Sequence, residues 1–143
     1  LEASLERLQT SYVDLYYIHA WDSGTPLKET LVTLNDLVRA GKIRYIGVAN
    51  FAAWQLQKAI DLCDKYNLEP ISCIQQQYSL LCRETEWDVL PCVRENRISL
   101  LPWSPLKGGW LSGRYKRGAP APQSGRYVSF SLPRASSGSC LSF

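Results

Sequence analysis

A histidine stands at the end of an apolar run near the start of the chain. The stretch VDLYYIHAWD, residues 13–22, places His19, the only histidine among 143 residues, just before a loop. An imidazole can take up or release a proton near neutral pH, so it can serve as an acid, a base or a hydrogen-bond donor to a reacting oxygen. The alternative is a histidine that bonds a backbone carbonyl, which position alone favours. As a base, His19 would need a carboxylate partner, and Asp22 is the only nearby candidate.

Amide, aromatic and glycine residues follow three further apolar stretches. Asn50 and Gln75 each offer a hydrogen-bond donor and an acceptor, and Trp103 offers a large aromatic face. Trp103 opens the segment WSPLKGG, residues 103–109, which contains a proline and two glycines. The alternatives are a helix cap at Asn50, a polar strand end at Gln75, a core tryptophan at Trp103 and a turn without a ligand at 103–109.

Strand-like and helical patterns alternate along the chain, which favours parallel strands joined by helical crossovers. An open doubly wound sheet and a closed barrel both fit this alternation. The open sheet usually carries GxGxxG after its first strand, whereas Gly108, Gly109 and Gly113 follow the fourth strand at another spacing. We therefore predict an α/β fold, a partial TIM (β/α)8 barrel of about four βα units with parallel strands. The expected strands are 12–18, 44–49, 71–75 and 98–103, and the expected helices are 28–40, 54–66 and 86–95.

In such a barrel the βα loops at the C-terminal ends of the strands carry the chemistry. The ends of the four expected strands bear His19, Asn50, Gln75 and Trp103. We expect these four side chains to gather on one rim.

At these residues the chain resembles the aldo-keto reductases, barrel enzymes that transfer hydride from NADPH to aldehydes and ketones. The matching segments are VDLYYIHAWD, GKIRYIGVANF, IQQQYSLLCR and LLPWSPLKGGWLSGRY, in that order. The resemblance implies that His19 orients and polarises the carbonyl oxygen of the substrate. It implies also that Asn50 and Gln75 hydrogen-bond the nicotinamide carboxamide and that Trp103, in a place where the family often has tyrosine, stacks on the nicotinamide.

The same resemblance assigns Ser104, Leu106 and Gly108 to the loop that meets the pyrophosphate of the cofactor. Position 49 is alanine where the family pattern usually has serine, so one carboxamide hydrogen bond is expected to be lost. Trp21 is expected either to line the substrate pocket or to pack as an ordinary aromatic residue. The family reaction also needs a tyrosine that donates a proton, a lysine and an aspartate, all expected in sequence before Leu1, and no tyrosine of this chain is assigned that role.

Two segments are expected. Residues 1–117 would form the partial aldo-keto reductase-like barrel, and residues 118–143, rich in serine and proline, would form a disordered low-complexity tail.

The resemblance implies NADPH-dependent reduction of aldehydes or ketones to alcohols, with this chain holding part of the cofactor and substrate site. The alternative is a non-catalytic, truncated reductase-like binding or regulatory subunit, or an incomplete gene product.

The composition limits the kinds of partner that we expect this chain to bind. The net charge is +3 and no acidic residue follows Glu95, but a solvated basic loop and tail explain this better than a nucleic acid partner. The five cysteines show no spacing typical of a metal site, and we expect reduced thiols in a cytoplasmic protein. No apolar run approaches the roughly 20 residues that cross a bilayer. Two open sheet edges in a partial barrel would allow self-association.

Overall fold

The structure, a computed structural model, describes residues 1–116, 118 and 120. It divides into two compact units, Leu1–Trp103 and a second that begins at Ser104. The elements of the first unit are α1 (Glu2–Leu8), β1 (Val13–Ile18), α2 (Leu27–Arg39), β2 (Ile43–Ala49), α3 (Ala53–Tyr66), β3 (Ile71–Gln77), the 3-10 helix η1 (Glu84–Glu86), α4 (Val89–Glu95) and β4 (Ser99–Trp103). The expected tail, 118–143, lies outside the described residues except for Gly118 and Pro120.

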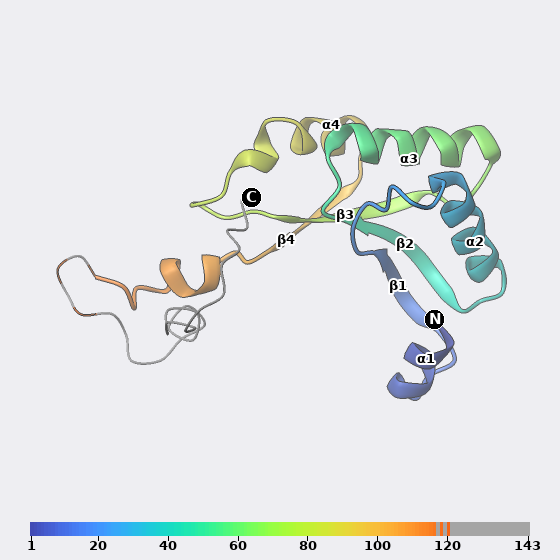
Figure 1. The fold of residues 1–143 in the computed structure, drawn as a ribbon, viewed down its shortest axis with the longest axis horizontal. Helices are drawn as coiled ribbons and strands as arrows, with labels where there is room; N and C mark the ends of the chain where they lie inside the picture. The colour runs from blue at the N-terminus through green and yellow to red at the C-terminus, as the bar shows by residue number, and fades with distance from the viewer. Residues whose placement is uncertain (117, 119, 121–143) are drawn as a thin grey trace. The chain divides into compact units, whose positions relative to one another are not determined.

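The four strands form one sheet in the order β1-β2-β3-β4, and every neighbouring pair is parallel. Figure 1 shows α2, α3 and α4 along one side of this sheet, as the crossover helices of a barrel lie on its outer face. The predicted fold class is confirmed: the strands and helices alternate as in part of a (β/α)8 barrel. Because the strands are parallel, their C-terminal ends meet at one edge.

The boundaries follow from local chemistry. Helix α2 ends at Arg39, as predicted, because Gly41 adopts a φ of 71° that glycine tolerates and its N–H bonds Val38 O at 2.8 Å. The prediction of a single helix over residues 86–95 is wrong in one respect. The segment is divided into η1 and α4, because Asp88 is not helical (φ −134°) and its Oδ1 accepts the N–H of Val89 at 2.7 Å as a cap.

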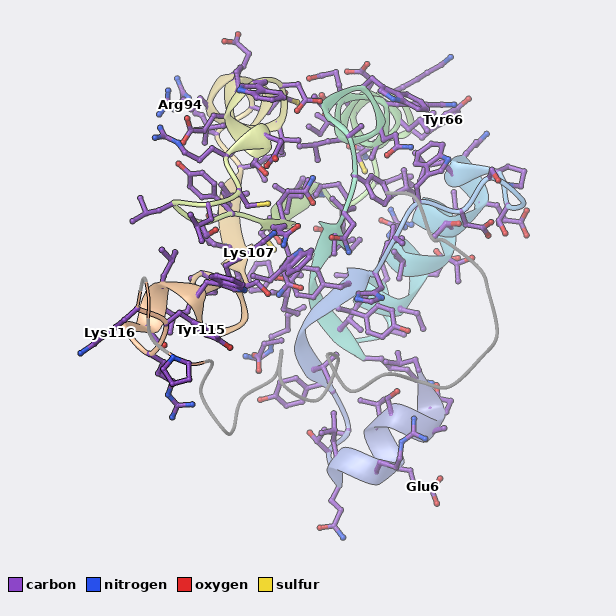
Figure 2. All side chains as sticks on the ribbon, turned by 60° about the vertical axis from the view of Figure 1, so that its left-hand side comes forward. Glu6, Tyr66, Arg94, Lys107, Tyr115 and Lys116 are labelled. Carbon is purple, nitrogen blue, oxygen red and sulfur yellow. The ribbon has the colours of Figure 1, made fainter. Side chains whose placement is uncertain are left out.

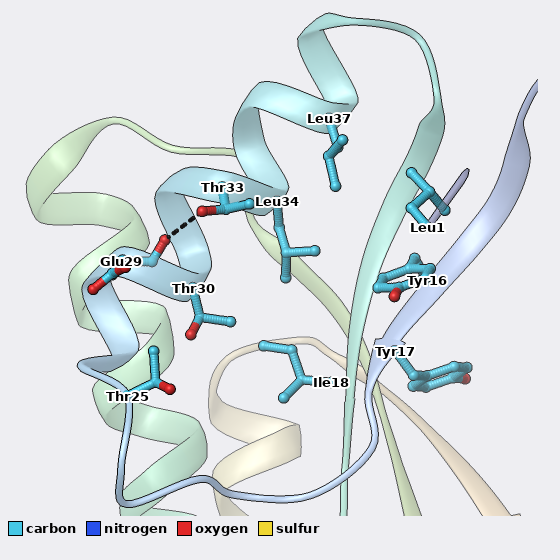
Figure 3. A pocket seen from close by; sticks show the side chains of 10 residues that line it. All are labelled: Leu1, Tyr16, Tyr17, Ile18, Thr25, Glu29, Thr30, Thr33, Leu34 and Leu37. Carbon is cyan, nitrogen blue, oxygen red and sulfur yellow. Dashed lines mark hydrogen bonds between the residues drawn. The ribbon is translucent and has the colours of Figure 1, made fainter. Parts of the chain in front are cut away.

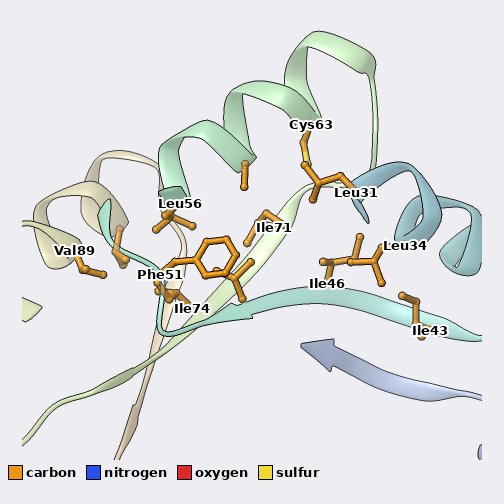
Figure 4. Packing of buried hydrophobic residues seen from close by; sticks show 13 residues of the cluster. Leu31, Leu34, Ile43, Ile46, Phe51, Leu56, Cys63, Ile71, Ile74 and Val89 are labelled. Atoms are coloured by element: carbon orange, nitrogen blue, oxygen red, sulfur yellow. The ribbon is translucent and has the colours of Figure 1, made fainter. Parts of the chain in front are cut away.

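The core lies between the sheet and the three helices (Figure 4). Phe51, in the loop between β2 and α3, is 1% exposed and is among the largest fully buried side chains. Leu31 and Leu34 from α2, Ile46 from β2 and Leu56 from α3 belong to the same cluster. Buried apolar surface of this kind is the main source of stability and fixes the loops that leave the strands.

Strand β1 forms an edge of the sheet, and beside it lies an apolar groove of about 470 Å³. Figure 3 shows Tyr16 and Ile18 of β1 facing Leu34 and Leu37 of α2 across this groove, with Leu1 at one end. Strand β4 forms the opposite edge, and Pro102 within it has no N–H to offer another strand. The two edges therefore differ in their capacity to pair.

Cys63 and Cys73 are buried free thiols, Cys92 is a half-buried free thiol and Cys82 is half-buried, while Cys140 lies outside the described residues. Burial raises the pKa of the Cys63 thiol to about 11, so this group remains protonated and unreactive near neutral pH. Within the described residues, no helix combines the length and apolar character that crossing a membrane requires.

Candidate active site

The side chain of Asn50 joins three strand ends. Its Nδ2 donates to His19 O, just after β1, at 3.0 Å, and its Oδ1 accepts the indole N–H of Trp103, the last residue of β4, at 3.0 Å. Because one partner is an acceptor and the other a donor, the orientation of the amide is fixed. The helix-cap role weighed for Asn50 is not seen, since the residue that caps α3 is Ala52.

The main chain of the same loop is held by β3. The N–H of Asn50 bonds Gln75 O at 3.0 Å, and Nε2 of Gln76 bonds Phe51 O at 2.9 Å. Asn50 has a φ of 57°, in the left-handed region that asparagine tolerates better than most residues. The loop is thus bent sharply at Asn50 and bonded on both sides of the bend.

His19 is exposed at the rim, and its main-chain carbonyl is the atom that Asn50 contacts. Asp22, weighed as a partner for a basic histidine, is otherwise engaged. Its Oδ1 accepts the N–H of Gly24 at 2.8 Å and its Oδ2 the hydroxyl of Thr25 at 2.7 Å, and these bonds, led by that from Thr25, lower the pKa of Asp22. Within residues 1–116 no His19–Asp22 pair forms.

Gln75 and Trp103 complete the group predicted for the rim. Gln75 is in register with Ala49 of β2 and Leu101 of β4, two residue pairs before the pairing of Gln77 with Trp103 at the end of β3. Gln75 and Trp103 are both partly exposed. In the part of the chain that the structure describes, the amide of Gln75 has no hydrogen-bond partner, so both its donor and its acceptor are available.

The four residue positions predicted for the rim are therefore brought together by the strand ends. Asn50 keeps one N–H and one lone pair beyond its bonds to His19 and Trp103, and Gln75 keeps its whole amide. A carboxamide such as that of nicotinamide presents the matching acceptor and donor. The residues present thus fit the nicotinamide end of a dinucleotide cofactor.

Trp21 packs against other aromatic residues. Its ring meets Phe51 edge-on at 5.4 Å and Trp54 at 5.3 Å, with the Lys58 ammonium 5.7 Å from its centre. Trp21 also borders a cavity of about 300 Å³ beside Asp22 and Lys58. These ring contacts tie the loop after β1 to the loop after β2 and to the start of α3, next to His19 and Asn50.

A tightly packed layer lies below the rim. A Cβ added at Gly47 would stand 2.6 Å from the ring of Tyr17 and 2.9 Å from Cys73 Sγ, so only glycine fits there. The thiol of Cys73 donates to Tyr17 Oη at 3.4 Å. Burial, with a smaller contribution from Cys73, raises the pKa of Tyr17 to about 12. No sequence pattern predicts this group, and its one local sign is Gly47 within the predicted strand 44–49.

The three residues assigned to the pyrophosphate belong to the second unit. Ser104, Leu106 and Gly108 border a cavity of about 370 Å³ together with Pro105 and Gly109. Ser104, Gly108 and Gly109 all have positive φ, and the turn is closed by Lys107 N bonding Ser104 O at 2.8 Å. Repeated left-handed turns of this kind direct successive backbone N–H groups into a concave surface.

The 3-10 helix η2 (Lys107–Ser112) overlaps this turn, and Gly108 and Gly109 within it have non-helical φ and ψ. Trp110 stacks on Tyr115 with ring centres 4.7 Å apart. Lys107, Tyr115 and Lys116 are labelled in Figure 2. Cationic and aromatic side chains of this unit thus lie close in sequence to the turn at 104–109.

Comparison with known proteins gives one family. The model of the "Aldo/keto reductase family" matches residues 1–131, which runs past the boundary expected at residue 117. An uncharacterized oxidoreductase of Bacillus subtilis, YrpG, is 43% identical over 114 residues, covering 80% of this chain and 35% of that protein. The human aflatoxin B1 aldehyde reductase member 2 is 38% identical over 116 residues, covering 81% and 32%.

An aldo-keto reductase of Pseudocercospora fijiensis is 38% identical over 117 residues, covering 82% of this chain and 40% of that protein. The chain thus spans between about a third and two fifths of the length of these curated relatives. The family model, the relatives and the parallel strand–helix alternation agree, and the chain belongs to the aldo/keto reductase family.

Proposed function

We propose that this chain holds the nicotinamide end of NADPH and the carbonyl group of an aldehyde or ketone during reduction of that group to an alcohol. The proposal is carried by one observation, the pair of hydrogen bonds by which the Asn50 amide donates to His19 O and accepts from the Trp103 indole. These bonds fix three strand ends at one rim and leave amide groups of the kind that a carboxamide needs. When bound, the cofactor supplies the hydride.

The residues of the rim would have different roles in binding the cofactor and the substrate. Asn50 and Gln75 bind the carboxamide and so select the face of the ring, and the Trp103 indole, held by Asn50, offers a flat surface for that ring. The imidazole of His19 donates a hydrogen bond to the substrate oxygen, where negative charge develops. The carbonyl held by His19 would take up at its carbon the hydride that the bound cofactor would supply.

The proton that completes the alcohol needs a separate donor. Among the described residues, Tyr17 and Tyr78 are the tyrosines whose pKa is shifted, and both are shifted upward, Tyr17 mainly by burial and Tyr78 mainly by its hydrogen bond to Glu86. A raised pKa makes a phenol a poorer acid, which is opposite to what the step needs. The family resemblance places the proton-donating tyrosine in sequence before Leu1, and we propose that the donor comes from polypeptide outside this chain.

The choice of NADPH rather than NADH rests on the family resemblance. The turn at Ser104–Gly109 supports a dinucleotide in general, because its cavity and positive-φ backbone suit a pyrophosphate. A titration with both nucleotides tests the preference directly. Tighter binding of NADPH than of NADH would support the proposal. Equal binding of the two nucleotides would reject the preference for NADPH.

The competing function is a non-catalytic binding subunit. Two measurements on the purified chain test both functions: quenching of tryptophan fluorescence by NADPH, and oxidation of NADPH in the presence of a reactive aldehyde. Binding without turnover is expected of the chain alone under either function, because the proton donor is assigned to other polypeptide. Turnover would contradict our assignment of the proton donor to other polypeptide, and no binding would reject the proposed function.

We also propose that the chain self-associates through the edge strand β1, next to its apolar groove. The opposite edge is less suited, because Pro102 of β4 lacks an N–H. Sedimentation of the purified chain over a range of concentrations tests this. A monomer at all concentrations would reject it.

A further inference from the structure

Two consecutive residues of β3 bind two consecutive residues of the loop after β2. Gln75 accepts the N–H of Asn50 through its main-chain oxygen at 3.0 Å, and Gln76 donates from Nε2 to Phe51 O at 2.9 Å. The first bond continues the sheet. The second is made by a side chain that the family resemblance assigns no role.

The carbonyl of Phe51 depends on this side chain. Phe51 is 1% exposed and lies just before α3, so water has little access to its main chain. A buried carbonyl without a donor is costly, and Gln76 supplies that donor. The ring of Phe51 is in turn fixed by Trp21, edge-on at 5.4 Å.

The position of Asn50 follows from these contacts. Its φ of 57° is a left-handed conformation that costs free energy and persists only if neighbouring bonds hold it. Gln76 is hydrogen-bonded to the carbonyl of Phe51, the residue directly after Asn50. If the loop relaxed, the Asn50 amide would have to give up His19 O, the Trp103 indole or both, because each bond is 3.0 Å long and they lie on different strands.

We infer that Gln76 is a positioning residue for the cofactor site: through Phe51 it fixes Asn50, and through Asn50 it fixes the Trp103 indole. This inference rests on the proposed function for its effect on cofactor binding, but not for its effect on Trp103. Gln76 itself contacts no cofactor. Its effect reaches the site only through the loop.

The test replaces Gln76 with leucine, which keeps most of the volume and removes the donor. Hydrogen exchange of the Trp103 indole N–H, assigned by its disappearance in W103F, should accelerate about fivefold, the factor that corresponds to one neutral hydrogen bond of about 1 kcal/mol. NADPH affinity should fall by a similar factor. The matched control is Gln57→Leu, which removes another partly buried glutamine, bonded to Asp61 and Asn96, away from this loop.

Q57L should lower the melting temperature yet leave both the Trp103 exchange rate and the NADPH affinity within about twofold of wild type. A second variant, Gln76→Glu, has a donor only when its carboxyl is protonated. Its Trp103 indole signal should therefore return toward the wild-type position as the pH falls.

The outcomes are separable. Unchanged Trp103 exchange in Q76L, with stability lowered as in Q57L, would overturn the inference. If the wild-type chain fails to bind NADPH while Q76L still accelerates Trp103 exchange, the proposed function fails and the coupling between Gln76 and Trp103 stands.

Discussion

Nε1 of Trp103 donates a hydrogen bond to Oδ1 of Asn50 over 3.0 Å, although β3 separates their strands in the sheet. The bond reaches across the end of β3, whose Gln75 carbonyl accepts the N–H of the same asparagine. With its bond to His19 O, Asn50 touches the ends of the other three strands. A single amide thus ties together the rim on which the proposed site is built.

Replacing Asn50 with alanine should damage both stability and binding. Two hydrogen bonds worth about 1 kcal/mol each are lost, and alanine at a φ of 57° adds about 1 kcal/mol of strain. We expect the free energy of unfolding to fall by about 2–3 kcal/mol and NADPH to bind at least about tenfold more weakly, as measured by urea denaturation and fluorescence titration.

Asn67→Ala is the matched control for this change. Asn67 is also exposed and left-handed, with a φ of 50°, but it ends α3 away from the rim. It should lose only about 1 kcal/mol and keep wild-type affinity. Equal NADPH affinity in N50A and N67A would contradict a role for the Asn50 amide.

His19→Leu should separate the main chain of His19 from its imidazole. The bond from Asn50 goes to the carbonyl oxygen, which leucine retains, so NADPH affinity should stay within about twofold. Binding of a small aldehyde to the chain saturated with NADP⁺ should weaken by about tenfold, the value of one hydrogen bond in a site. Ligand-observed NMR measures this second step, and unchanged aldehyde binding would exclude the imidazole from the substrate site.

Gly47→Ala should destabilise the sheet. The added Cβ would overlap the ring of Tyr17 and the sulfur of Cys73, and overpacking of this kind costs about 3 kcal/mol. Urea denaturation measures the loss. Gly24→Ala is the control, because its nearest neighbour is the flexible carboxylate of Asp22 at 3.2 Å, and we expect a change within about 0.5 kcal/mol. Similar losses in the two variants would show that the Tyr17–Gly47–Cys73 contact is not tight.

The stability of the fold should decline at alkaline pH. Burial raises the pKa of Tyr17 from 10.0 to about 12, so the folded chain keeps a proton that the unfolded chain releases. The contribution is fully present below pH 10 and is lost as the pH rises toward about 12. Cys63, whose pKa is raised from 9.0 to about 11, adds a decline that begins at lower pH.

Tyr17→Phe should flatten the part of this decline that lies above pH 10, whereas Tyr45→Phe, at a residue 60% exposed, should not. Urea denaturation at a series of pH values measures it. An identical pH dependence in Y17F and wild type would show that Tyr17 titrates normally in the folded chain.

Most of the fold could be predicted from the sequence, because each element has a local signal. Apolar, β-branched runs predicted all four strands within a few residues, and Gly41 marked the end of α2. The division of the third predicted helix was missed, although Asp88 before Val89 is itself a helix-start signal. The family assignment, carried by four short segments, is confirmed by the family model and the relatives.

The site could be predicted only in part, because its contacts are not local. That His19, Asn50, Gln75 and Trp103 share a rim follows from parallel strands. The bond between Asn50 and Trp103 spans 53 residues and that between Gln76 and Phe51 spans 25, and no periodicity reports which amide meets which carbonyl. The roles of these residues toward cofactor and substrate stay predictions.

The most direct measurement separates the two halves of the cofactor. Reduced nicotinamide mononucleotide and adenosine 2′,5′-bisphosphate are each titrated into the isotope-labelled chain, while NMR follows the Asn50 side-chain amide and the Trp103 indole N–H. Our account predicts that the nicotinamide fragment shifts both signals and that the adenosine fragment leaves them in place. Shifts caused by the adenosine fragment alone, or by neither fragment, would contradict a nicotinamide site at this rim.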